Sequence, residues 1–219
     1  MNVFHRILFV VIAVCIPVVS LFSALNIVFR LPDLYVYEFN KNQVVNQVDL
    51  GITDDELGRF FSDFMKGKEE EFDLFTEYRD REQAVFGTAE QINMENARKL
   101  LNFSLFVLGG AALLQVVSYC VFLGGKKKRE LRGAFKGGIL IFAILVVLLY
   151  TLLYFKQTRE ALYNLIFISS FGADDVLPLM LTDQFSLIAL VAVSAVGLVL
   201  MVVMASVTWR MTKPRRMFW

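Results

Sequence analysis

Residues 185–208 read FSLIALVAVSAVGLVLMVVMASVT, without an Asp, Glu, Lys, Arg or His, and decide the fold class. An α-helix of roughly 20 apolar residues crosses the hydrocarbon core of a bilayer. Residues 7–29, 101–123 and 137–155 meet the same requirement. Hydrophobic residues make up 57% of the chain and its mean hydropathy is +0.57, values at which a soluble domain would lack a polar surface. The sequence therefore predicts an all-α polytopic membrane protein with four transmembrane helices.

The basic residues predict the orientation of these spans, because cytoplasmic flanks are rich in Lys and Arg. Residues 124–136 hold six basic residues against one acidic residue, and residues 209–219 hold four against none. Residues 30–99 hold nine against sixteen, and residues 156–183 hold two against four. We therefore expect the first two segments and both termini in the cytoplasm of a bacterial cell, and the other two outside.

This reading divides the chain into alternating membrane and aqueous segments. The first span could instead be a cleaved secretory signal, but its apolar run exceeds the usual 7 to 15 residues. We therefore retain it as a span. The predicted segments are an N-terminus with the first span (1–29), an extracytoplasmic cap (30–99), the second span (100–123), a basic loop (124–136), the third span (137–155), an outer or interfacial loop (156–183), the fourth span (184–208) and a basic tail (209–219).

The cap carries fold signals of a small α(+β) domain. Residues 34–45, LYVYEFNKNQVV, place aromatic and β-branched residues around a polar turn, which predicts a short hairpin or extended pair. Residues 53–56, TDDE, read as a capping box before a helix with an apolar stripe. The stripe could pack in the cap or lie on the outer leaflet, and we favour the cap. The charged residues 66–71 predict a solvated loop.

A second capping signal, TAEQ at residues 88–91, predicts a helix that continues into the second span. The later segment 161–168, ALYNLIFI, is apolar but too short to cross the membrane. Backbone at that depth must be covered by protein or line a wet cavity. We therefore expect the cap and this loop to enclose a pocket at the outer lipid boundary, a place for a lipid or a lipidated substrate.

Several stretches together resemble the bacterial lipoprotein intramolecular transacylases of the Lit type. They are YVYEF (35–39), GITDDEL (51–57), FGTAEQINM (86–94), YNLIF (163–167) and TD (182–183), in the order of the family's four-span plan. The resemblance implies transfer of an acyl chain from the glyceryl part of a lipoprotein's diacylglyceryl cysteine to that cysteine's α-amino group. In the family, histidines are expected to do this work.

The chain departs from the family pattern at these positions. Asn93 and Asn164 stand where the resemblance places the two histidines, and Asn96 stands where it places an Asp. An amide can donate a hydrogen bond to an oxyanion but does not titrate near neutral pH. The single histidine, His5, flanks the first span on the predicted cytoplasmic side.

Four residues are candidates for catalytic groups: Glu90, Asn93, Asn164 and Asp183. Glu90 lies one helical turn before Asn93 and could act as a substitute base, or it could simply favour the helix start. Asp183 could likewise cap the fourth span. Asn93 and Asn164 could line a pocket or cap backbone groups. No cofactor, metal or disulfide motif is present, and Ser169 and Ser170 lack an adjacent activating group.

Two functions from different classes follow, and whether the chain is an enzyme is left open between them. The first, which we favour, is a non-catalytic or diverged homologue with an outer-leaflet pocket for a lipid or lipoprotein. The second is an active acyltransferase with a substituted base. A transporter is disfavoured because the spans lack ionisable residues. The expected partners are membrane lipids and bacterial lipoproteins; nucleic acid is not expected, because topology explains the basic residues.

Overall fold

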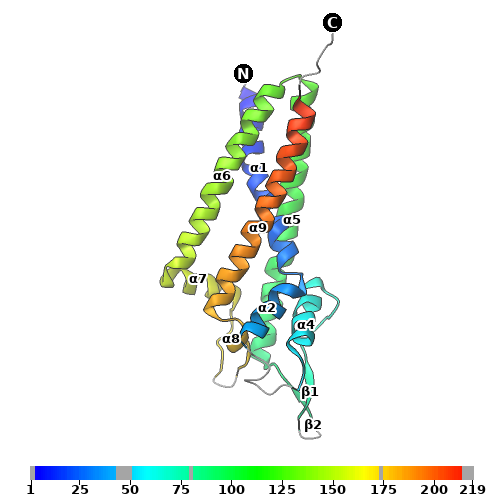
Figure 1. Cartoon of the computed structure of the whole chain (residues 1–219), viewed down its shortest axis with the longest axis vertical. Coiled ribbons are helices and arrows are strands. Elements are labelled where there is room, and N and C mark those ends of the chain that lie inside the picture. Colours follow the sequence, from blue (N-terminus) through cyan, green and yellow to red (C-terminus); the bar gives the residue numbers. More distant parts are fainter. Residues whose placement is uncertain (1–2, 43–50, 79–80, 173–174, 214–219) are drawn as a thin grey trace. The chain divides into compact units, whose positions relative to one another are not determined.

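The structure is a computed structural model that describes residues 3–42, 51–78, 81–172 and 175–213. Figure 1 shows its helices and strands along the chain. They are α1 (Val3–Val28), α2 (Pro32–Asn42), α4 (Asp54–Lys66), β1 (Phe75–Tyr78), β2 (Arg81–Ala84), α5 (Thr88–Gly124), α6 (Lys128–Tyr154), α7 (Lys156–Ile166), α8 (Leu177–Met180) and α9 (Asp183–Thr212).

Four of the helices, α1, α5, α6 and α9, are long and apolar enough to cross a membrane. Each of the four predicted spans lies within one of these helices, apart from one residue at the end of the first and of the third span, so the prediction of a four-span all-α membrane protein is confirmed. The chain clusters into two compact units. Unit 1 comprises Met1–Ala24, Ser104–Tyr150 and Val193–Trp219, and unit 2 comprises Leu25–Phe103 and Thr151–Ala192.

Unit 1 is held together by close helix packing. The Ser20 hydroxyl donates to the Gly197 carbonyl at 2.6 Å, which requires α1 and α9 to approach closely. A Cβ on Gly197 would lie 3.3 Å from the Phe142 ring on α6, so the small residue leaves room for that ring beside α9. The buried core of unit 1 is formed by Ile12, Ile16, Phe122, Leu131, Ala134, Phe135, Phe142 and Met201.

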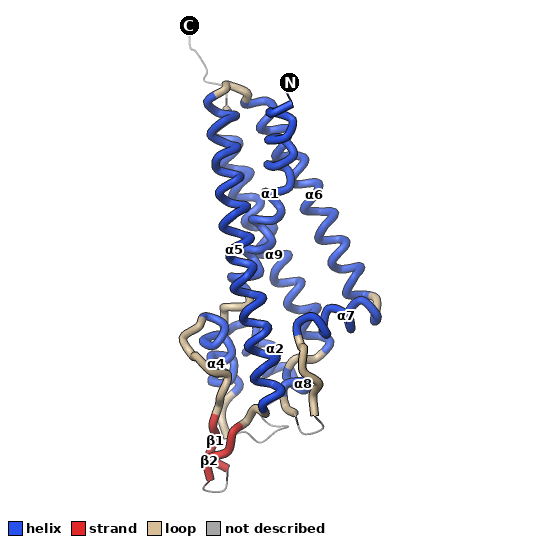
Figure 2. The backbone as a smooth tube through the Cα atoms, turned by 180° about the vertical axis from the view of Figure 1, so that it is seen from behind, coloured by secondary structure: helices blue, strands red, loops and turns tan. Residues whose placement is uncertain are grey.

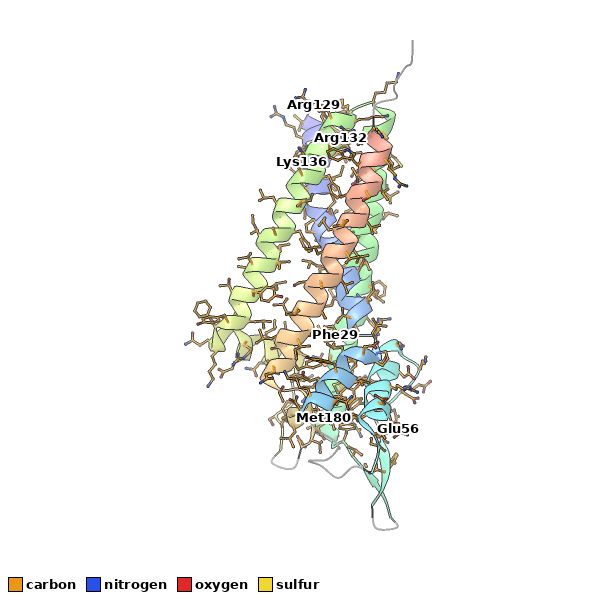
Figure 3. The ribbon with its side chains drawn as sticks, viewed as in Figure 1. Phe29, Glu56, Arg129, Arg132, Lys136 and Met180 are labelled. Atoms are coloured by element: carbon orange, nitrogen blue, oxygen red, sulfur yellow. The ribbon has the colours of Figure 1, made fainter. Side chains whose placement is uncertain are left out.

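The basic residues of unit 1 gather where α6 begins and α9 ends. Figure 3 shows Arg129, Arg132 and Lys136 along the start of α6. The Arg132 guanidinium donates to the Thr212 hydroxyl at 2.7 Å and to its carbonyl at 2.8 Å, and lies 4.8 Å from the centre of the Trp209 ring. The basic loop and the end of α9 thus share one end of unit 1. That this end is cytoplasmic stays a prediction from charge.

Within unit 2, α2 corrects one prediction. Residues 34–42 are helical, so the predicted hairpin is wrong, and residues 43–45 lie outside the described part of the chain. Pro32 at the first helical position, Asp33 in the first turn and Lys41 in the last turn are all helix signals. Residues Tyr35 and Phe39 are one helical turn apart and both buried, so the apparent alternation was part of a helical stripe.

Next in unit 2, α4 confirms the predicted capping box. The Glu56 amide donates to the Thr53 hydroxyl at 3.2 Å and the Thr53 amide donates to Glu56 Oε2 at 2.9 Å. The hydrogen bond from the Thr53 backbone holds the pKa of Glu56 below its usual value. The apolar stripe is buried within unit 2, as favoured, and it packs beside α2 (Figure 1). The charged residues that follow, 66–71, are exposed as predicted.

The strands of unit 2 form an antiparallel hairpin that the sequence did not indicate. Figure 2 shows β1 and β2 side by side. In their antiparallel register, Phe75 pairs with Ala84. The α(+β) character of the cap is therefore present, with its strands at residues 75–84 rather than at residues 34–45.

An aromatic cluster forms the core of unit 2. The ring centres of Phe61 and Phe72 lie 5.1 Å apart, and those of Phe72 and Phe86 lie 4.4 Å apart. Tyr35 lies 5.4 Å from Phe61, and its hydroxyl donates to the Phe29 carbonyl at 2.9 Å. Burial raises the pKa of Tyr35. Rings in such edge and tilted contacts pack α2, α4 and the start of α5 together.

Replacing Gly58 by alanine should loosen this packing. A Cβ at Gly58 would press on the Val36 side chain and lie 2.9 Å from the Val36 backbone nitrogen, so α2 and α4 would have to separate. We expect a local loss of about 1–3 kcal/mol, measured as faster hydrogen exchange in α4. Gly110→Ala is the matched control, because a Cβ there meets nothing within 4 Å. Equal exchange in both variants would contradict this account of the packing.

Candidate functional site

The site begins where α5 begins. Gln91 N donates to the Gly87 carbonyl at 3.0 Å, so Gly87 caps the helix, and Thr88, which the sequence indicated as the cap, is its first helical residue. Glu90 is then the third helical residue, and its Oε2 accepts from the Gly87 amide at 2.7 Å. This is the acidic half of a capping box, in which a helix-start Glu satisfies an unpaired amide.

Glu90 has a second partner far along the chain. Its Oε1 accepts a short hydrogen bond from the Leu177 amide at the start of α8, and only 1% of the residue is exposed. Both carboxylate oxygens therefore hold backbone N–H groups, one at the start of α5 and one at the start of α8. In this arrangement Glu90 joins two segments of backbone.

One turn further along α5, Asn93 makes a paired contact with backbone. Its Nδ2 donates to the Ser169 carbonyl at 2.9 Å, and its Oδ1 accepts from the Ser169 amide at 2.7 Å. Asn93 is fully buried. A primary amide presents a donor and an acceptor side by side, which suits this pairing, whereas the two nitrogens of an imidazole point apart.

Asn96 repeats the pattern one turn later. Its Nδ2 donates to the carbonyl of Ile166 at 2.7 Å and also approaches the carbonyl of Leu165 at 3.3 Å. Both carbonyls lie in the last turn of α7, where the helix has no N–H groups left to donate to them. Glu90, Asn93 and Asn96 thus form a polar row on α5, spaced by three residues, that holds backbone groups of Leu165, Ile166, Ser169 and Leu177.

The other two candidates lie elsewhere. Asn164 is exposed and lies on a face of α7 that lines a shallow hollow of about 280 Å³, together with Lys156, Arg159, Glu160 and Tyr163. Asp183 is the first residue of α9, and its side chain lies outside the described part of the structure. The structure therefore brings Glu90 and Asn93 together on α5 and leaves Asn164 on the exposed face of another helix.

A second cavity, of about 230 Å³, lies in the segment that the polar row holds. Most of its walls are apolar. It is lined by Tyr163, Phe167, Phe171, Leu177, Pro178, Leu181 and Thr182. The Tyr163 hydroxyl donates to the Thr182 carbonyl at 3.2 Å, which ties α7 to the residue before α9. We refer to this space as the aromatic cavity.

Glu38 on α2 reaches the edge of the aromatic cavity. The Thr182 hydroxyl and Asn42 Nδ2 both donate to Glu38 Oε1 at 3.0 Å. Glu38 is fully buried, and its Oε2 has no hydrogen-bond partner among the described residues. The sequence reasoning did not select this residue as a site. The sequence signal that could have indicated Glu38 is its position on the same helical face as Tyr35 and Phe39, where a carboxylate is expected to be buried.

The comparisons with known proteins identify the family. The family model described as lipoprotein intramolecular transacylase Lit matches residues 10–185. The chain belongs to the Lit family. Among solved structures, the membrane-integral Lit from Bacillus cereus is 19% identical, with a TM-score of 0.75 and 100% of each chain covered. No match is found among curated protein sequences.

Two further structures of the B. cereus Lit carry a replaced histidine. The variant with arginine in its place is 19% identical, with a TM-score of 0.74 over 97% of this chain and 94% of that chain. The variant with alanine is 18% identical, with a TM-score of 0.74 over 98% and 96%. At this identity the likeness shows that the fold is shared.

The only histidine of this Lit-family chain lies in unit 1. His5 is in the first turns of α1, with its ring 6.0 Å from the ring of Phe122. It is roughly 35 Å along that helix from Val28 at the other end. Among the described residues, no group of three or more His, Cys, Asp or Glu side chains is placed to hold a metal ion.

Replacing Asn93 by aspartate tests the paired contact. The carboxylate would keep the acceptor for the Ser169 amide but would place a second oxygen against the Ser169 carbonyl, so we expect a loss of about 1–3 kcal/mol. The readout is limited chymotrypsin digestion in detergent, with faster cleavage after Phe167 or Phe171. Asn164→Asp is the matched control because Asn164 is exposed, and it should change stability by less than about 0.5 kcal/mol. Equal cleavage rates in the two variants would refute the role of Asn93 in holding the backbone of Ser169.

Proposed function

We propose that this chain is a diverged Lit-family protein that binds a lipidated polypeptide at the outer side of the membrane without transferring its acyl chain. One observation carries the proposal. Asn93 and Asn164 stand at the positions that the resemblance assigns to the family's histidines. Asn93 uses both its Nδ2 and its Oδ1 to hold the backbone of Ser169. An amide held in this way has no basic lone pair with which to deprotonate an amine.

Glu90, one of the two acidic candidates, supports the same conclusion. A base must lie within hydrogen-bond reach of the proton that it removes. Glu90 is almost fully buried, and its two oxygens already accept the amides of Gly87 and Leu177. The apolar walls of the aromatic cavity suit contact with an acyl chain, because dispersion contacts are individually weak but add up over a packed surface.

The test is to express the chain in a bacterium that lacks other N-acylating enzymes. An intramolecular transfer leaves the mass of a lipoprotein unchanged, so fragmentation must locate each acyl chain on the lipidated cysteine. We expect the α-amine to stay free and reactive toward an amine reagent. The B. cereus Lit is the positive control and should place an acyl chain on the amine. An N-acylated cysteine in cells with this chain would overturn the non-catalytic part of the proposal.

Binding is measured separately on the purified full-length chain. A fluorescent diacylglyceryl-cysteinyl peptide should bind to the chain in nanodiscs and be displaced by the unlabelled peptide. A soluble peptide of the same sequence without lipid should not compete. Failure of the lipidated peptide to bind would overturn the binding part of the proposal.

A further inference from the structure

Arg132 on α6 is held in one position by the end of α9. Its Nε donates to the Thr212 hydroxyl at 2.7 Å, its Nη2 donates to the Thr212 carbonyl at 2.8 Å, and the guanidinium lies 4.8 Å from the centre of the Trp209 ring. These contacts satisfy one side of the planar guanidinium. Nη1 donates to none of the described residues, and none of their carboxylates forms an ion pair with Arg132. Arg132 is therefore fixed in place and can still donate to a further partner.

Other basic residues lie beside Arg132. Arg129 precedes it by three residues and Lys136 follows it by four, spacings that place side chains on one face of a helix. All three lie along the start of α6 (Figure 3). Lys213 directly follows Thr212 at the end of α9, and Arg129, Lys136 and Lys213 are all exposed. We refer to Arg129, Arg132, Lys136 and Lys213 as the cationic face.

The cationic face has no acidic neighbour to neutralise it. Glu130 is the only Asp or Glu in the sequence of unit 1. It points to a different side of α6 from Arg129, because each residue of a helix turns by about 100° from the one before. Its carboxylate lies 4.0 Å from the Lys127 ammonium instead. Like charges gathered on one face repel one another, so the face favours an anion as its ligand.

The surface that continues from the cationic face is apolar. Leu140 and Ile144 follow Lys136 along α6 at intervals of four residues and are 63% and 57% exposed. Trp209, beside Arg132, is 55% exposed and is a residue typical of the boundary between headgroups and hydrocarbon. An anion that carries acyl chains can contact the cations with its headgroup and the apolar stripe with a chain. The surface therefore suits a phospholipid better than a free anion.

We propose that the cationic face binds the phosphate of an anionic phospholipid in the leaflet at this end of unit 1. Arg132 Nη1 donates to a phosphate oxygen, the other three cations add charge, and an acyl chain lies along Leu140 and Ile144. Phosphatidylcholine fits less well, because its choline would meet the same positive charges. This site lies in unit 1 and goes beyond the proposed function, which concerns residues of unit 2.

The orientation of the chain in the membrane also favours basic residues at a cytoplasmic end, but that requirement is for charge alone. It does not require one arginine to be held by two hydrogen bonds and an aromatic ring, and it does not require the cations to share a helix face. The two explanations differ in one measurable way. A specific site depends on which cation is removed, whereas a general attraction depends only on how many are removed.

Binding is measured on the purified full-length chain in mild detergent by native mass spectrometry, with phosphatidylglycerol and phosphatidylcholine of the same acyl chains. Each basic residue near an anionic lipid contributes about 1 kcal/mol, or about fivefold in affinity. Phosphatidylglycerol should therefore bind at least about tenfold more tightly than phosphatidylcholine. Excess inorganic phosphate should not displace it, since a free phosphate has no chain to place on the apolar stripe.

Variants then assign the preference to its residues. Arg129→Gln and Lys136→Gln should each weaken the binding of phosphatidylglycerol about fivefold and leave that of phosphatidylcholine unchanged. Arg132→Lys keeps the charge but loses the planar guanidinium, so it should weaken binding as well. Lys126→Asn is the matched control. It removes one exposed charge from the turn before α6, at a φ of 56° that asparagine tolerates, and should bind as the unmodified chain does.

Each contrary outcome removes a specific part of the inference. Equal binding of the two lipids would overturn the preference for an anionic lipid. Losses as large in Lys126→Asn as in Arg129→Gln would show a general attraction to basic residues and overturn the site. Full binding by Arg132→Lys would overturn the role of the guanidinium, and displacement by inorganic phosphate would overturn a phospholipid as the ligand.

Discussion

The backbone between α7 and α9 is irregular, and its peptide groups need hydrogen-bond partners. The arrangement of unit 2 depends on this requirement. Between the end of α7 and the start of α9, most residues have no regular helix or strand to satisfy their peptide groups. The row of polar side chains on α5 supplies these partners: Glu90 holds Leu177, Asn93 holds Ser169 and Asn96 holds Ile166. Because the residues that line the aromatic cavity belong to this stretch or flank it, the three side chains on α5 hold backbone that adjoins the cavity.

The same constraint supports our proposal that this family member lacks the acyl-transfer chemistry which the resemblance implies. An amide at Asn93 is well suited to pair with a peptide group, and it is poorly suited to accept a proton. We therefore propose a shared fold in which the residue at position 93 holds backbone and does not take up a proton.

Local patterns in the sequence were sufficient for the parts of the fold that depend on local physics. The spans follow from hydrophobic length, and the start of α4 follows from the capping box at Thr53 and Glu56. The helix α2 was mistaken for a hairpin because the aromatic residues of a short helical stripe also fit an alternating pattern. The partners of Asn93 and the burial of Glu38 involve residues 76 and 144 positions away along the chain, and no local pattern specifies such contacts.

Hydrogen exchange at the Ser169 amide of the unmodified protein in lipid nanodiscs tests the central claim most directly. Ser169 lies outside every helix and strand, and Asn93 Oδ1 accepts its amide proton at 2.7 Å. Exchange at Ser169 should therefore be slowed along with exchange at Leu177, because both amides are released only when the segment leaves α5. Exchange at Ser169 as fast as in an unstructured peptide would contradict the paired contact between Asn93 and Ser169, and with it our proposal that Asn93 holds backbone and does not act as a base.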